Sequence, residues 1–189
     1  MVKVQSELAE LNLRSGAQDM VIERLTKALA AVTAPIVNSY KRLTHGAPSS
    51  GASWAPVYVT YGPSNRTQMI RTAGPGHFED RAFSAAANPY LALAAYLTAG
   101  LDGVKRGLEP GEPNLGNMYE RPAGEIAKAG IKVLPQSLNE ALEELRQDEL
   151  VQSALGPIAE EFIVMKANEW AEYDSQVSRW EVDQYLTSL

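Results

Sequence analysis

Apolar residues near the start of the chain recur at close to helical spacing. They approximate a period of about 3.6 residues and stop before Pro35: Met20, Ile22, Leu25, Leu29 and Val32. We therefore predict a helical lead over residues 1–37. The stretch from Tyr40 to Ala55 is poor in apolar residues and rich in serine, glycine and proline, which predicts a long loop.

Three short segments then show the composition of strands. They are separated by turns rich in glycine and proline, and they span Val57 to Tyr61, Arg66 to Thr72 and His77 to Phe83. Short connections favour antiparallel pairing. Since side chains alternate along a strand, His77, Glu79 and Arg81 are expected on one face, with Phe78 and Asp80 on the other.

The second half of the chain has the pattern of helices. Asn88 followed by Pro89 predicts a helix start, and the helix should run to about Arg106. Its nearly apolar run from Tyr90 to Leu101 is shorter than the ~20 residues that cross a bilayer, so we predict a buried helix. Ser137 and Glu140 have the spacing of a capping box before a further helix.

These elements predict an α+β fold in which short antiparallel strands are followed by several helices. The chain has 189 residues, which suits a single domain. We divide it into a divergent helical lead (1–37), a strand and loop part (38–87) and a helical part (88–189).

Composition narrows the class of protein. Hydrophobic residues make up 45% of the chain and charged residues 21%, as in ordinary globular proteins. The chain contains no cysteine, which excludes disulfides and thiolate chemistry. Its first residues lack the charged-then-apolar order of a secretory signal, so we expect a cytoplasmic protein without a membrane span.

Positive charge is concentrated in one region. Asn38 to Phe83 holds five basic residues against two acidic ones, giving +3, whereas the whole chain is −6. Guanidinium groups bind carboxylate or phosphate oxygens two at a time, so a small acid or a nucleotide phosphate would fit. The basic residues form no continuous basic face, which disfavours nucleic-acid binding.

The residues around these arginines form an ordered series of short motifs. The series contains Asn38-Ser39-Tyr40-Lys41-Arg42-Leu43, Asn65-Arg66-Thr67, Phe78-Glu79-Asp80-Arg81, Ala86-Ala87-Asn88-Pro89-Tyr90-Leu91, Leu134-Pro135-Gln136-Ser137-Leu138 and Arg179-Trp180-Glu181-Val182-Asp183-Gln184-Tyr185-Leu186. Together they resemble the catalytic domain of the glutamine synthetase family, over roughly Ala30 to Leu189.

The resemblance implies ATP-dependent ligation of glutamate with an amine through a γ-glutamyl phosphate, in the presence of Mg²⁺ or Mn²⁺. Arginines and metal ions suit phosphoryl transfer because they stabilise developing negative charge. By resemblance, Arg42 and Arg81 hold glutamate and Arg66 acts catalytically on the transferred phosphoryl group. Arg71 contacts the nucleotide phosphates, and Glu79 binds the metal. The plain alternative is that Glu79 simply pairs with Arg71 or Arg81.

The sequence departs from the family upstream of Asn38. The remaining metal carboxylates and the metal-binding histidine of the family have no counterpart in Met1 to Val37. A single carboxylate cannot complete an octahedral oxygen site. We therefore expect either the C-terminal part of a longer enzyme or a truncated descendant, working as a homo-oligomer or with a complementing N-terminal segment. A non-catalytic oligomerisation or regulatory remnant is the alternative.

A second departure concerns the amine. Ammonia-using members carry Glu-Ala-Pro where this chain has Trp54-Ala55-Pro56, and an indole cannot serve as a base. Its apolar ring suits a methyl or alkyl group, although Trp54 could instead pack beneath its loop. The segment resembles the type III branch that includes γ-glutamylmethylamide synthetase, a glutamate–methylamine ligase. Ammonia, a small alkylamine and a larger amine such as putrescine all stay open, as does modification of Tyr119.

Overall fold

The computed structural model describes residues 26–43, 56–63, 66–74 and 77–186. Residues 26–33 are helical, and the helix ends before Pro35, as its apolar spacing predicts. Helix α2 (Val37–Leu43) follows and is tied to the preceding helix by the Tyr40 hydroxyl, which donates to the Ala30 carbonyl at 3.2 Å. Residues 40–43 belong to α2, so the predicted loop is wrong for its first four residues. Residues 1–25 of the predicted lead and residues 44–55 of the predicted loop lie outside the described residues.

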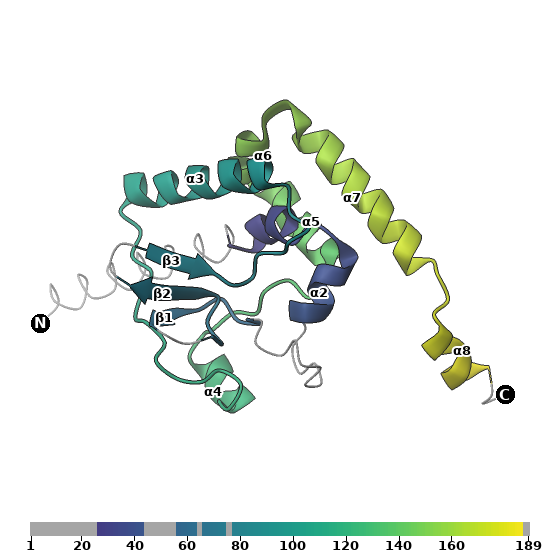
Figure 1. The fold of residues 1–189 in the computed structure, drawn as a ribbon, viewed down its shortest axis with the longest axis horizontal. Helices are drawn as coiled ribbons and strands as arrows, with labels where there is room; N and C mark the ends of the chain where they lie inside the picture. The colour runs from purple at the N-terminus through teal and green to yellow at the C-terminus, as the bar shows by residue number, and fades with distance from the viewer. Residues whose placement is uncertain (1–25, 44–55, 64–65, 75–76, 187–189) are drawn as a thin grey trace, which may run out of the picture.

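Three short strands form one sheet in the order β1-β2-β3 (Figure 1). They are β1 (Tyr61–Pro63), β2 (Ile70–Gly74) and β3 (His77–Asp80). Strands β2 and β3 are antiparallel, as predicted, and Arg71 lies opposite Glu79.

Strands β1 and β2 are parallel, so the prediction of antiparallel pairing is wrong for this pair. The reason is that residues 66–69 form turns and bends instead of the first half of a strand. Strand β2 therefore begins only at Ile70, whose N–H donates to the Thr60 carbonyl at 3.0 Å. It runs in the same direction as β1, so the two strands do not form the expected hairpin.

The first predicted strand is also divided. Tyr58 forms an isolated antiparallel bridge with Val133, and the Leu134 N–H donates to the Val57 carbonyl at 2.8 Å. Only Tyr61 of the predicted segment belongs to β1. Residues 57–59 therefore connect the sheet region to the second half of the chain, where α4 (Ala123–Lys128) covers a small apolar cluster.

Helix α3 (Pro89–Arg106) begins and ends where the sequence predicts. The Asn88 side chain accepts hydrogen bonds from the Tyr90 and Leu91 N–H groups, which satisfies two free donors of the first turn. Gly107 ends the helix at φ 60°, a left-handed conformation that glycine adopts without strain. Only one face of α3 is buried, through Ala92 and Ala95, so the prediction of a buried helix holds for that face and is wrong for the other.

Helices occupy the remainder of the chain, as predicted. They are α5 (Leu138–Gln147), α6 (Glu149–Leu155), the 3₁₀ turn η1 (Gly156–Ile158), α7 (Ala159–Asp174) and α8 (Arg179–Tyr185). Ser137 caps α5, and Ser178 and Glu181 form a capping box on α8. None of the helices that the structure describes combines the length and apolar character that a membrane crossing needs.

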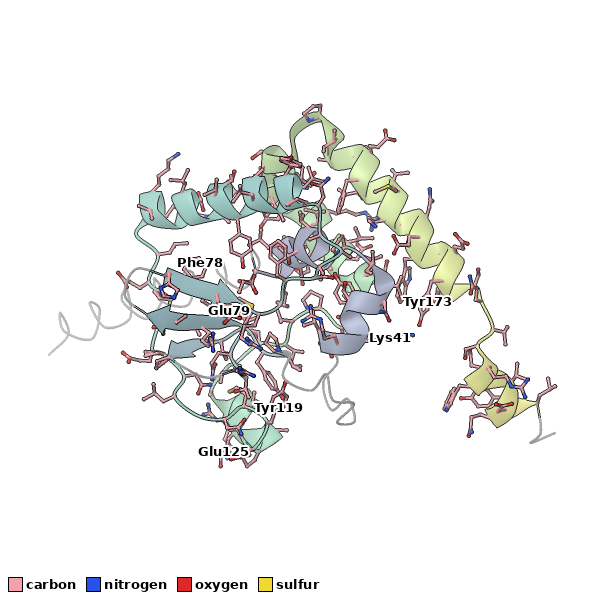
Figure 2. The ribbon with its side chains drawn as sticks, in the orientation of Figure 1. Lys41, Phe78, Glu79, Tyr119, Glu125 and Tyr173 are labelled. Carbon is pink, nitrogen blue, oxygen red and sulfur yellow. The ribbon has the colours of Figure 1, made fainter. Side chains whose placement is uncertain are left out.

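The main core lies where α3, α5, α6 and α7 meet residues 26–34. Its fully buried side chains include Leu43, Leu138, Leu142, Leu145 and Val151. Each leucine of this kind stabilises the fold by roughly 1.5–3 kcal/mol through burial. Figure 1 shows α7 and α8 extending away from the sheet, and Figure 2 shows Lys41 of α2 beside Tyr173 of α7, with Nζ 5.8 Å from the ring centroid.

Candidate active site

Arg71 and Glu79 form a cross-strand ion pair on one face of the sheet. Their Cα atoms are partners in the β2–β3 register, and Arg71 Nη2 lies 2.6 Å from Glu79 Oε2. Side chains directly opposite in an antiparallel pair point to the same face, so the register itself brings the two charges together.

Arg81 completes a cluster around the same carboxylate. Its Nη1 donates to Glu79 Oε1 at 3.0 Å, while its Nε donates to the Arg66 carbonyl at 3.1 Å. Glu79 therefore lies between two guanidinium groups, and all three side chains are partly buried. The alternative prediction, that Glu79 pairs with Arg71 or Arg81, is confirmed, since Glu79 forms ion pairs with both.

Arg42 approaches this cluster from α2 but binds main-chain oxygens. Its Nη1 donates to the Arg81 carbonyl at 3.2 Å, and its Nη2 donates to the carbonyls of Ala82 and Phe83 at 2.9 and 3.2 Å. Burial lowers the pKa of Arg42, Asp80 opposes this shift and Arg81 adds to it. The geometry shows that Arg42 fixes the chain directly after β3.

Asp80 occupies the opposite face of the sheet, as the alternation predicts. It accepts from the Ala82 N–H at 2.7 Å and from the hydroxyl of Tyr96 on α3. Burial raises the pKa of Asp80 to about 6, while the Ala82 N–H and Arg42 oppose the shift. Asp80 thus joins β3 to α3 and turns away from the Glu79 cluster.

The predicted site residues are therefore brought together to different degrees. Side chains of Arg71, Glu79 and Arg81 meet directly. The Arg66 side chain is exposed, and its main chain is held by Arg81. Trp54 lies outside the described residues.

The structure also brings two tyrosines to this region. Tyr96 was not predicted, although it is a polar-ended residue within a nearly apolar helix, and that contrast was a usable signal. Burial raises the pKa of Tyr119, and the nearby Arg81 lowers it. Figure 2 shows Tyr119 on the segment that leads to α4.

The donor set of the described residues does not fit a divalent metal by itself. No three acidic or histidine side chains come together in the parts of the chain that the structure describes. Glu79 is the single carboxylate of the cluster, and both its oxygens contact arginines. Mg²⁺ prefers six oxygen ligands in an octahedron, so further carboxylates or waters would be required.

An anion fits the cluster better. Two guanidinium groups flank one carboxylate, which leaves a net positive charge. Arg71 Nε and Glu79 Oε2 are buried and make no hydrogen bond within the described part of the chain, although Oε2 lies in ion-pair contact with Arg71 Nη2. A buried donor without an acceptor is unfavourable, so an oxyanion that reached it would stabilise this arginine.

Comparisons with known proteins identify the family of this chain. The family described as "Glutamine synthetase, catalytic domain" matches residues 21–185. A glutamate–methylamine ligase from Methyloversatilis universalis is 52% identical over 159 residues, covering 84% of this chain and 36% of the relative. A glutamine synthetase from Thermococcus kodakarensis is 43% identical over 176 residues, covering 85% of this chain and 38% of the relative.

A solved structure described as a GmaS/ADP complex superposes with a TM-score of 0.78 at 39% sequence identity. The superposition covers 92% of this chain and 40% of the other. The chain thus spans less than half the length of the curated relatives that it matches. The resemblance inferred from the ordered motifs is confirmed, and the chain belongs to the glutamine synthetase family.

Proposed function

We propose that this chain supplies the arginine-rich part of an active site that joins glutamate to ammonia or a small alkylamine with ATP. The observation that carries the proposal is the clustering of Arg71 and Arg81 around Glu79 on a single sheet face. The names of the relatives support the same reaction class, since they are a glutamate–methylamine ligase and a glutamine synthetase.

The proposed chemistry has two balanced steps. A side-chain carboxylate oxygen of glutamate attacks the γ-phosphorus of ATP, and the bond to ADP breaks to give γ-glutamyl phosphate. The amine nitrogen then attacks the acyl carbon, phosphate leaves, and the nitrogen loses a proton as the amide forms. Both steps carry concentrated negative charge, which arginines held in place can stabilise.

Each arginine receives a role that suits its contacts. Arg81 binds the glutamate substrate, and the exposed Arg66 contacts the transferred phosphoryl group. Arg71 binds the nucleotide phosphates, for which its unsatisfied Nε is a suitable donor. Since Arg42 donates to three carbonyls, its contacts favour a positioning role that holds Arg81.

The reaction needs groups beyond the described residues. Mg²⁺ or Mn²⁺, which the family implies, would supply positive charge at the phosphates when bound. Glu79 can contribute one ligand only if its contacts with the arginines loosen. We therefore infer that the remaining carboxylates come from a complementing segment or a neighbouring subunit.

Trp54 is proposed to form an apolar wall for the amine substituent. The relative that uses methylamine by name favours a small alkyl group. A larger diamine such as putrescine would need a longer pocket. An enzyme of that kind would turn over putrescine faster than methylamine.

A non-catalytic role is the second candidate. It is favoured by one observation, namely that both oxygens of Glu79 are already paired with arginines. The test measures ADP formation from ATP with glutamate, Mg²⁺ and methylamine, using the chain together with the part of the M. universalis ligase that it does not match. Glutamate- and methylamine-dependent ADP formation supports the ligase, whereas a folded complex without turnover supports the non-catalytic candidate.

A further inference from the structure

Residues 66–69 carry Arg66 through an irregular stretch between β1 and β2, and we call them the Arg66 segment. Arg66 itself is exposed, whereas the next three side chains are buried. A segment of turns and bends has no helix or strand ladder to hold it. Its position therefore depends on contacts with neighbouring parts of the chain.

Arg81 holds the two ends of the Arg66 segment. Its side-chain Nε donates to the Arg66 carbonyl at 3.1 Å, and its main-chain N–H donates to the Met69 carbonyl at 2.9 Å. Because Arg81 directly follows β3, both contacts fix the ends of the segment relative to the sheet.

Two buried polar side chains hold the middle of the segment against a distant loop. Thr67 Oγ1 accepts from the Met118 N–H at 3.0 Å, and Gln68 Nε2 donates to the Gly116 carbonyl at 3.0 Å. These partners lie 51 and 48 residues away in the sequence. Threonine and glutamine are mostly surface residues, yet Thr67 is 2% and Gln68 0% exposed, so their hydrogen bonds compensate for burial.

The loop that receives these bonds, residues 114–118, is itself firmly held, and we call it the anchor loop. The Asn114 N–H donates to the Tyr61 carbonyl of β1 at 2.8 Å, and Asn114 Oδ1 accepts from the Gly116 N–H at 3.0 Å. Met118 is buried in the small apolar cluster beside α4, which lies below β1 in Figure 1. The anchor loop is therefore a fixed support for the Arg66 segment.

Gln68 has contacts that suit positioning better than stability. Its Oε1 is buried and makes no hydrogen bond within the residues that the structure describes. A buried acceptor without a donor is unfavourable, and an apolar side chain of similar size would avoid this cost. The feature that a glutamine adds at this position is the bond from Nε2 to the anchor loop.

We propose that Thr67 and Gln68 are positioning residues, which fix Arg66 against the anchor loop so that its guanidinium meets the transferred phosphoryl group. The proposal rests on the proposed function for the role of Arg66. Both side chains are buried and act through the main chain of Arg66. A main chain that is ordered in advance lowers the entropy cost of placing an exposed arginine on an anion.

The test uses ¹⁵N relaxation of the labelled 189-residue chain, with inorganic phosphate as the probe. In the wild-type protein the Arg66 main-chain N–H should have an order parameter of about 0.85, and phosphate should shift the Arg66 Nε–H resonance. Thr67→Val and, separately, Gln68→Met should lower this order parameter below about 0.6. Each should also raise the phosphate concentration for half of the shift at least ~10-fold.

Two variants serve as controls. Thr67→Ser keeps the hydroxyl acceptor and should restore both the order parameter and the phosphate response. Thr33→Val replaces a threonine that is equally buried, at 2% exposed, in the helix of residues 26–33. It should leave both measurements as in the wild-type protein, because Thr33 lies outside the Arg66 segment and the anchor loop.

Three results would overturn the proposal. One is an Arg66 N–H that stays rigid in both Thr67→Val and Gln68→Met, and another is a loss that Thr67→Ser does not restore. The third is loosening that spreads over β1, β2 and β3, which would indicate a general loss of stability. If the two variants loosen Arg66 but phosphate shifts no Arg66 resonance in the wild-type protein, the positioning contacts are sustained and the phosphoryl role of Arg66 is removed.

Discussion

Arg71 and Glu79 face each other across the antiparallel strands β2 and β3, with Nη2 of one 2.6 Å from Oε2 of the other. This pair fixes one side of a carboxylate whose other side is bound by Arg81. The strand register places Arg71 beside Glu79, and Arg81 reaches the same carboxylate from the residue after β3. Arg71 of β2, Glu79 of β3 and Arg81 directly after β3 form the cluster that we propose to bind an anion.

The strength of the Arg71–Glu79 pair is measurable. Because both side chains are partly exposed, we expect a coupling free energy of only about 0.5–1 kcal/mol. A double-mutant cycle with Arg71→Met and Glu79→Gln, followed by urea unfolding, gives this value. The corresponding cycle on the exposed Arg146–Glu143 pair of α5 is the control, and it should give less. Zero coupling at Arg71–Glu79 would show that the register does not join the two charges.

Arg42 should matter more for stability than either residue of that pair. It donates to three carbonyls, and hydrogen bonds from a charged donor contribute about 1.5–3 kcal/mol in mutational series. We expect Arg42→Met to lower the free energy of unfolding by at least about 2 kcal/mol. Arg106→Met removes an exposed pair with Asp102 and should change it by less than about 0.5 kcal/mol. Equal effects would contradict a positioning role for Arg42.

The raised pKa of Asp80 should make the free energy of unfolding depend on pH. Burial raises its pKa from 3.8 to about 6 in the folded protein, so the folded state holds the proton more tightly. The stability linked to this group is present below about pH 4 and is lost as the pH rises through about 6. Asp80→Asn should remove this fall, which we expect to be on the order of 2 kcal/mol.

The measurement is urea unfolding of wild-type and Asp80→Asn proteins between about pH 4 and 7. The amide oxygen of the Asp80→Asn variant can still accept from the Ala82 N–H, so the comparison isolates the charge. Asp102→Asn, in an exposed ion pair of α3, serves as the control, and this variant should lose stability with rising pH as the wild-type protein does. Parallel curves for wild-type and Asp80→Asn proteins would show that the buried carboxyl does not titrate in this range.

Gly62 is required where the loop before Met118 meets β1. A Cβ at this position would lie 2.2 Å from the Asn114 carbonyl oxygen, and the Asn114 N–H donates to the Tyr61 carbonyl at 2.8 Å. Gly62→Ala should therefore destabilise the protein by more than about 2 kcal/mol, through a main-chain clash next to Arg71. Gly124→Ala in α4 meets no atom within 4 Å and should be neutral or stabilising by up to about 1 kcal/mol. Thermal unfolding of the two variants tests the contrast.

Local chemistry predicted much of the fold. Asn88 and Pro89 defined the start of α3, because a side-chain cap and a proline act within one turn. Strand alternation separated Glu79 from Asp80 correctly, since the side-chain period of a strand depends only on neighbouring residues.

Long-range pairing could not be predicted in the same way. The parallel register of Ile70 with Tyr61 depends on a return loop, and no local pattern specifies it. The Arg42 side chain finds carbonyls about forty residues away, which motifs and periodicity do not reveal. The resemblance assigned Arg42 to substrate, whereas its contacts in the structure join α2 to the main chain after β3.

The proposed ligase function is tested most directly by measuring turnover of this chain in complex with the rest of a related enzyme. In the purified complex with the unmatched part of the M. universalis ligase, ADP formation should require both glutamate and methylamine. Arg81→Met should reduce it at least ~100-fold, because a lost charge-stabilising donor commonly has an effect of this size. Arg146→Met, on exposed α5 surface, should leave it unchanged. Turnover that survives Arg81→Met in an intact complex would contradict the assignment of this cluster as the anion-binding part of the active site.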